Sequence, residues 1–147
     1  MIVVSSLLIG ALSGCSGSPS DRLGELLGCL EGDAGTIAVG VANTSGDALV
    51  VEGVELADSS GVEIVDRFIA VDEDARSTAV RFDLGGRDSL GGVDLAEQAI
   101  EANAAAFVGV EVVRTGSEEG RVGGLVITVD GDDRAVPVTL DLRDNCG

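Results

Sequence analysis

The side chains that perform most enzymatic chemistry are scarce in this sequence. It has 147 residues with no His, no Trp and no Tyr, three Phe and three Cys, and no Lys among its nine cations. Hydroxyl and thiol nucleophiles need a base within reach, usually His or Lys, so Ser-His, Ser-Lys and Cys-His mechanisms are excluded. Carboxylate pairs could hydrolyse glycosides, but sugar sites commonly use aromatic platforms, and three Phe make a poor platform. We therefore expect no enzymatic activity and no cofactor.

Acidic clusters are the remaining candidates for site chemistry. Two groups of carboxylates lie in predicted turns: Asp72, Glu73 and Asp74, and then Asp130, Asp132 and Asp133. Calcium needs several oxygen ligands converging on one point, and neither group matches the spacing of an EF-hand loop. Both groups are weak candidates for calcium ligands, and each is well explained as a solvated turn. Zinc is a poorer match, because Cys29 and Cys146 are far apart in the sequence.

The charge balance excludes one class of partner. Nine Arg against 26 carboxylates leave a formal net charge of -17. Such a surface repels phosphate backbones, so we expect no nucleic-acid partner. A solvated acidic coat that keeps the domain soluble is the simplest interpretation, and adaptation to high salt or cation binding are the alternatives.

A short apolar segment near the N terminus ends in a cysteine. Residues 2–12 carry no charge, and Ser13-Gly14-Cys15 follows them. The segment has the length of a signal-peptide core, roughly 7 to 15 residues, and is shorter than the about 20 residues of a transmembrane helix. No Lys or Arg precedes it, so we expect the true translation start to lie upstream.

The motif Leu12-Ser13-Gly14-Cys15 resembles the lipobox of bacterial lipoproteins. The resemblance implies that the signal peptide, residues 1–14, is removed and that Cys15 carries a diacylglycerol thioether. Acyl chains such as palmitate contribute about 0.8 kcal/mol per buried methylene, and two of them anchor a protein stably. The implied location is the extracytoplasmic face of the cell membrane. A plain secretion signal and an ordinary buried Cys are the alternatives.

The rest of the chain divides into a tether and one domain. Residues 15–20 have the composition of a flexible linker, and residues 21–147 suffice for a single core. With Cys15 lipidated, Cys29 and Cys146 remain in an oxidising compartment, and we predict a disulfide between them. Two separate thiols are the alternative.

Short apolar segments separated by Gly, Asp, Asn and Ser predict β-strands from residue 36 onward. Gly53 interrupts the alternation of its segment and predicts a bulge. Residues 130–133 predict a tight hairpin, and Pro137, which has no N–H to donate, predicts an edge or an irregularity. The predicted strands are residues 36–43, 48–56, 61–71, 78–84, 107–114, 124–129 and 134–142.

Two helices and one connector complete the prediction. Asp94 and Glu97 have the spacing of a capping box, which predicts a helix over residues 94–106. Four Leu at helical spacing favour a second helix over residues 21–31. The glycine-rich residues 85–92 lack the Lys and the spacing of phosphate-binding loops, so we interpret them as a mobile connector.

About seven short strands predict a mainly β fold, an antiparallel immunoglobulin-like β-sandwich with one short helical crossover. The turn Asn43-x-Ser45-Gly46-Asp47 and a final strand ending in Cys resemble immunoglobulin-like domains of actinobacterial surface lipoproteins. We therefore expect a non-enzymatic, lipid-anchored domain that contacts another envelope protein through residues 85–93 and 115–123. The alternative is a carrier of a small ligand, a lipid or calcium, with an apolar cavity between its sheets or a filled carboxylate cluster.

Overall fold

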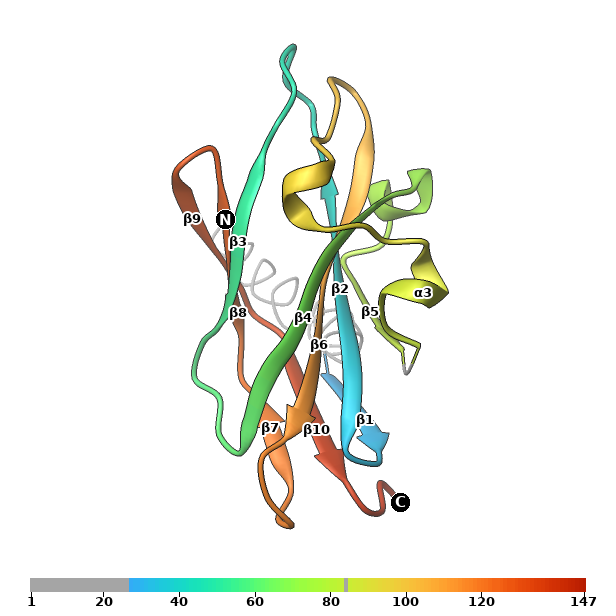
Figure 1. Ribbon diagram of the computed structural model, residues 1–147, viewed down its shortest axis with the longest axis vertical. Coiled ribbons are helices and arrows are strands. Elements are labelled where there is room, and N and C mark those ends of the chain that lie inside the picture. Colours follow the sequence, from blue (N-terminus) through green and yellow to red (C-terminus); the bar gives the residue numbers. More distant parts are fainter. Residues whose placement is uncertain (1–26, 84) are drawn as a thin grey trace, which may run out of the picture.

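Ten short strands make up most of the chain in the computed structural model, which describes residues 27–83 and 85–147 (Figure 1). The predicted β-sandwich is confirmed. The elements in order are β1 (Leu27–Glu31), β2 (Ala34–Ala42), β3 (Val51–Leu56), β4 (Val62–Val71), η1 (Glu73–Arg76), β5 (Val80–Asp83), α3 (Gly86–Leu90), η2 (Leu95–Glu97), β6 (Ala105–Arg114), β7 (Gly120–Val122), β8 (Leu125–Val129), β9 (Asp132–Val136) and β10 (Thr139–Arg143).

The strands form three sheets arranged in two layers (Figure 1). One layer is the four-stranded sheet β4-β6-β2-β5, and the other contains the three-stranded sheets β3-β8-β9 and β1-β10-β7. All pairings are antiparallel except the one between β1 and β10. The main core lies between the layers and draws on strands from all three sheets; its fully buried members include Ile37, Val54, Val108, Val110, Ile127 and Leu140.

The outer face of the four-stranded sheet is covered as well, at least in part. A second cluster there joins Ala38 and Phe107 to Ala75 of η1. The ring of Phe68 lies over Gly109 of the neighbouring strand, where a Cβ atom would overlap it. Because both faces of the central strands are buried, β6 shows six consecutive buried residues at its start and not the alternation of a half-exposed strand.

The predicted helix over residues 94–106 is wrong. Only the 3-10 turn η2 forms, and the Asp94 side chain makes no capping hydrogen bond. Ile100 instead pairs with Leu49, each backbone N–H donating to the other's carbonyl at 2.9 Å, and residues 105 and 106 already belong to β6. These tertiary hydrogen bonds use the backbone groups that a helix would need, so they override the local preference of an Ala-rich segment.

The helix predicted over residues 21–31 is also wrong where the structure describes it. Residues 27–31 form β1, which pairs in parallel with β10; residues 21–26 lie outside the described residues. The ring of Phe82 contacts Gly28 so closely that no Cβ atom would fit there. A glycine required by strand packing disfavours a helix at the same position.

The predicted turns and strands are found, with one strand divided, and the predicted loop over residues 115–123 contains the additional strand β7. The register shifts between Val51 and Gly53, as expected for a bulge, and Asp130 and Gly131, both with positive φ, form a two-residue hairpin turn. The single strand predicted over residues 134–142 is two strands, β9 and β10, in different sheets. Pro137 lies between them, so the predicted irregularity is confirmed.

The predicted disulfide between Cys29 and Cys146 is confirmed. Their Cα atoms are 5.9 Å apart, and 117 positions of sequence separate them. The bridge joins β1 to the segment that follows β10 and so closes nearly the whole domain into one loop.

Candidate functional site

One candidate contact surface lies at an end of the sandwich, where the β3–β4 connection and the β6–β7 loop are neighbours (Figure 1). Ser60, Gly61 and residues 115–119 line a hollow of about 440 Å³. Backbone hydrogen bonds fix the two segments together: Thr115 donates to Gly61 at 3.0 Å, and Ser60 and Arg121 donate to each other at 2.9 and 2.8 Å. The loop is exposed throughout, so it presents a polar, acidic surface on an ordered base.

Arg114 anchors this end of the sandwich. Its side chain is only 6% exposed, and Nη2 lies 2.7 Å from carboxylate oxygens of both Asp33 and Asp144. Hydrogen bonds from Asp144 and Asp33 raise the pKa of Arg114 above its already high usual value. The ion pairs connect the β1–β2 turn, β6 and the C-terminal segment, which holds the base of the β6–β7 loop in place.

The glycine-rich residues 85–92, which the sequence indicates are a mobile connector, make side-chain contacts with the rest of the domain. They contain α3, and Arg87 reaches from it to Asp66 at 2.7 and 2.9 Å and to Asp94 at 2.7 Å. The Arg87 guanidinium holds the pKa of Asp66 below its usual range. Val93 and Ile69 exchange backbone hydrogen bonds, so residues 85–93 pack on the sheet and offer less free loop than residues 115–119.

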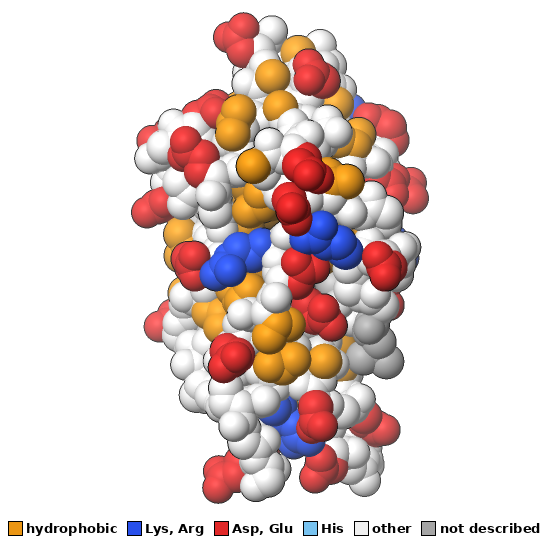
Figure 2. All heavy atoms as spheres, in the orientation of Figure 1, with side chains coloured by type: hydrophobic (Ala, Val, Ile, Leu, Met, Phe, Trp, Pro, Cys, Tyr) orange, Lys and Arg blue, Asp and Glu red, His pale blue; other side chains and the backbone are white. Residues whose placement is uncertain are grey.

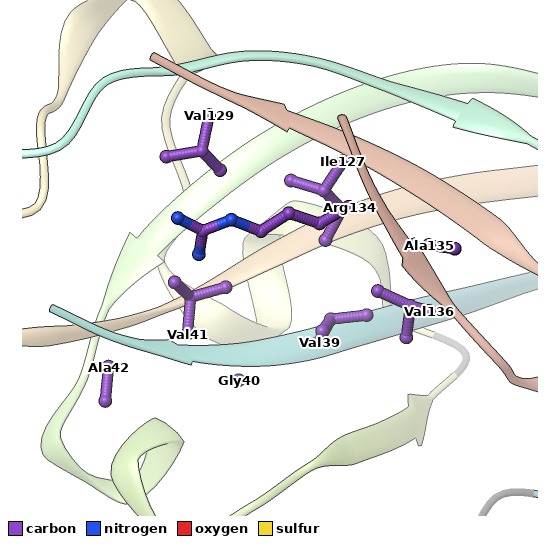
Figure 3. Close-up of a pocket in the computed structure, with 9 residues that line it drawn as sticks. All are labelled: Val39, Gly40, Val41, Ala42, Ile127, Val129, Arg134, Ala135 and Val136. Atoms are coloured by element: carbon purple, nitrogen blue, oxygen red, sulfur yellow. The ribbon is translucent and has the colours of Figure 1, made fainter. Parts of the chain in front are cut away.

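A second candidate site is a cavity of about 320 Å³ at the side of the sandwich (Figure 3). It lies between the end of β2 and the strands β8 and β9, and its lining is apolar except for one side chain: Val39, Gly40, Val41, Ala42, Ile127, Val129, Arg134, Ala135 and Val136. Figure 3 shows the Arg134 side chain extending between the valines of β2 and β8. The site therefore combines apolar walls with a single cation.

The backbone explains why Arg134 faces inward. Arg134 lies directly opposite Ile127 on the neighbouring strand, and residues paired in this way project from the same face of a sheet. Ile127 is buried in the core, so Arg134 occupies the inner face of β9. β9 is an edge strand and Arg134 is exposed to solvent, so the guanidinium lies at the mouth of the cavity and not within the core.

Arg134 differs from the other arginines in its partners. Among the residues that the structure describes, Arg67, Arg76, Arg87, Arg114, Arg121 and Arg143 all form ion pairs, and Arg81 lies 6.0 Å from the Phe107 ring centroid. No such contact is found for Arg134 within the same part of the chain. Its positive charge is therefore available to a ligand.

Four of the six carboxylates considered as calcium ligands already bind protein groups. Asp72 accepts a hydrogen bond from the Asp74 N–H at 2.9 Å, and Glu73 pairs with Arg76 at 2.9 Å. In the second group, Asp130 accepts from the Val50 N–H and Asp133 from the Thr128 hydroxyl. Across residues 27–83 and 85–147, no group of three Cys, Asp or Glu could hold a metal ion. Neither group is brought together as a metal site.

Asn43 is a fully buried polar residue with a structural role. Its amide nitrogen donates to the carbonyls of Asp47, at 2.7 Å, and of Ile100, at 2.9 Å, while its side-chain oxygen accepts from the Ser45 N–H. The Asn43-x-Ser45-Gly46-Asp47 turn thus links the β2–β3 connection to the segment before β6 through hydrogen bonds. It is a structural feature and not a ligand site.

Arg134 is not among the candidate residues predicted from the sequence, although its place in the apolar pattern could have singled it out. Val136, Val138, Leu140 and Leu142 form one alternating apolar face, and Arg134 continues that face by one more step of two residues. A charged residue on the buried side of a strand is unusual and marks either an edge or a site. Cys15, the predicted lipidation site, lies outside the described residues.

On the face shown in Figure 2, charge is distributed and is not gathered in one patch. Acidic side chains are scattered over the face shown in Figure 2, with few basic groups and apolar areas between them. No helix in the described part of the chain has the length and apolar character required to cross a membrane.

Comparison with known proteins assigns no family. No protein-family model and no curated protein matches the sequence. A secreted serine protease, VesC from Vibrio cholerae, has 14% identity and a TM-score of 0.34, over 79% of this chain and 20% of that one. A family 123 glycoside hydrolase from Clostridium perfringens has 11% identity and a TM-score of 0.30, over 79% and 22%. The chain thus spans about a fifth of the length of each, and such distant likenesses support no inference about activity.

Proposed function

We propose that this protein is a non-enzymatic, lipid-anchored domain on the extracytoplasmic face of the cell membrane, where it contacts another envelope protein. The anchor is Cys15, through its resemblance to a lipobox cysteine. The contact surface is the hollow formed by Ser60, Gly61 and residues 115–119. A contact function fits a chain without His or Lys, since hydroxyl and thiol nucleophiles lack their usual bases.

The observation that carries the choice of surface is the exposed β6–β7 loop on a fixed base. Residues 115–119 are all exposed, while Arg114 beneath them is held by two carboxylates. Binding residues are often found on loops that a rigid scaffold positions. The opposite end of the sandwich contains the turn that Asn43 holds, and the polar groups of the Asn43 side chain already form hydrogen bonds within the domain.

A site-specific photo-crosslinker in the native cell tests this proposal. Gly116 lies in the β6–β7 loop and Gly46 in the β2–β3 turn at the other end (Figure 1). Neither glycine has a positive φ, and a Cβ atom at either one would meet no atom within 4 Å. The two positions therefore accept the same substitution equally well and form a matched pair.

We expect the crosslinker at Gly116 to capture one envelope protein, and the crosslinker at Gly46 to capture that protein at least several-fold less. Capture should also fall when Cys15→Ala is combined with the Gly116 position, because the unanchored domain no longer shares the membrane with its partner. Equal capture from both ends, or from neither end in the anchored protein, would contradict the contact surface.

A second candidate function, small-ligand binding, is favoured by the lateral cavity. Ligand sites are typically clefts of about 300 to 1,000 Å³ with apolar walls and a few placed polar groups. The cavity beside Arg134, at about 320 Å³, falls within that range.

A further inference from the structure

The two sides of the sandwich are closed in different ways. On one side the edge strands β3 and β4 are joined by Arg67, whose Nε donates to the Val54 carbonyl at 2.8 Å and whose Nη2 pairs with Glu55 at 2.9 Å. On the other side the edge strands are β9 and β5, and β5 pairs with β2 only as far as Val39. The Gly40 N–H adds one more hydrogen bond, to the Ala79 carbonyl at 3.0 Å. Residues 41 and 42 extend beyond this contact, and the lateral cavity lies beside the end of β2.

The cavity carries a specific chemical preference. Its lining includes Val39, Val41, Ile127, Val129 and Val136, so its walls favour an apolar group. Arg134 is the single charged residue among the nine lining residues. A guanidinium is always charged, has no acceptor, and matches a carboxylate through two parallel hydrogen bonds.

The volume limits the size of the occupant. A water-sized group takes up about 30 Å³ of liquid volume, so a cavity of about 320 Å³ holds on the order of ten non-hydrogen atoms. An unbranched carboxylic acid of eight carbons has that size, with its tail between the valines and its carboxylate at the mouth.

We propose that the lateral cavity binds a small apolar carboxylate, with its hydrocarbon part between β2 and β9 and its carboxylate paired with Arg134. This site is separate from the contact surface at residues 115–119, and the proposal rests on the second candidate function, small-ligand binding, and not on the contact function. The net charge of -17 acts against an anion at long range, but at physiological salt the Debye length is about 8 Å. None of the nine residues that line the cavity carries a carboxylate, and Asp133, which precedes Arg134, lies on the opposite face of β9.

Octanoate is the probe that tests the proposal. The full chain carrying Cys15→Ser, which has no lipid of its own, is labelled with nitrogen-15 and titrated with octanoate at about 0.15 M salt, near the physiological value. We expect saturable changes in the amide resonances of residues 39–42 and 134–136. In Arg134→Gln the affinity should fall about tenfold or more, because a charge-assisted hydrogen bond is lost.

Three comparisons keep the outcome unambiguous. Arg81→Gln removes an exposed arginine on the neighbouring strand β5 and should leave octanoate binding unchanged. Octan-1-ol, which has the tail without the charge, should bind at least several-fold more weakly than octanoate. Val41→Phe fills the cavity and should abolish binding while the rest of the spectrum remains that of a folded protein.

Three results would overturn the proposal. They are resonance changes confined to other regions, an Arg134→Gln affinity within twofold of the parent, and octan-1-ol binding as tightly as octanoate.

Discussion

Asp141 is the ionisable side chain whose environment most clearly affects stability. It lies on β10, its side chain is 13% exposed, and Arg121 and Arg143 lie at 2.8 and 3.2 Å. The hydrogen bond from Arg121 holds the pKa of Asp141 below its usual range, against the opposing effect of burial. The unfolded chain, with an Asp pKa of about 3.9, then binds more protons than the folded one. This stabilisation is complete above that pKa and is lost as the pH falls through the folded value.

Asp141→Asn should therefore lower the free energy of unfolding by about 1 to 2 kcal/mol at neutral pH, since charge-assisted hydrogen bonds are lost. The variant should also lose less stability than the parent between about pH 5 and pH 2. Asp66, whose pKa is likewise lowered, accounts for part of the loss that the variant still shows. Urea unfolding at several pH values measures both effects. Glu118→Gln, at an exposed position, is the control. An Asp141→Asn protein as acid-sensitive as the parent would contradict the role of this carboxylate.

Gly109 is a second residue with a specific packing role. The Phe68 ring occupies the space that a Cβ atom would need, so Gly109→Ala should lower the free energy of unfolding by about 1 to 3 kcal/mol through overpacking. Gly53→Ala is the matched control, because a Cβ atom at that strand glycine meets nothing within 4 Å. Its stability should stay within about 0.5 kcal/mol of the parent. Equal urea midpoints for the two variants would show that Phe68 has no such constraint.

At the scale of the elements, β9 is an edge strand with a charge on its inner face. Inward-pointing charges are one way in which β-proteins prevent pairing between exposed edges. Arg134→Val should therefore raise the fraction of dimers or larger species, measured by light scattering after size-exclusion chromatography. Asp133→Val, on the outer face of the same strand, is the control and should stay monomeric. Identical behaviour of the two variants would show that the inner charge does not protect the edge.

The disulfide is the other device that acts on whole elements. Replacing Cys29 and Cys146 by Ser should lower the free energy of unfolding by as much as about 4 to 5 kcal/mol, the chain-entropy value for a loop of this length. The rate of amide hydrogen exchange should rise first in β1, because β1 pairs only with β10 among the described strands. Reduced parent protein should show the same urea midpoint as the double variant. An unchanged midpoint in both would mean that the bridge does not stabilise the domain.

Most strands could be predicted from the sequence because their alternation and turn residues are local features. The Asp130-Gly131 hairpin, the bulge at Gly53 and the break at Pro137 each follow from one residue's backbone preference. The segment before β6 could not be predicted, because the pairing of Ile100 with Leu49 is a tertiary contact. The lateral cavity was missed for the same reason, since β2 and β9 are adjacent only in the folded chain.

The whole molecule combines a domain with a strongly acidic surface and an N-terminal segment that resembles a lipoprotein signal. The charge of -17 is carried entirely by residues 15–147, because residues 1–14 contain no charged side chain. A domain of this charge is repelled by anionic lipid headgroups. The proposed attachment through acyl chains on Cys15 would hold such a domain at the membrane without requiring its surface to bind lipid.

Metabolic labelling with an alkyne fatty acid tests this attachment most directly. In a bacterial host that processes lipoproteins, the parent and the Cys29→Ser, Cys146→Ser double variant should both incorporate the label, since their Cys15 is intact. Cys15→Ser should incorporate none and should leave the membrane fraction. Label retained on the Cys15→Ser protein, or a parent protein that is exported without any label, would contradict a lipid anchor at Cys15.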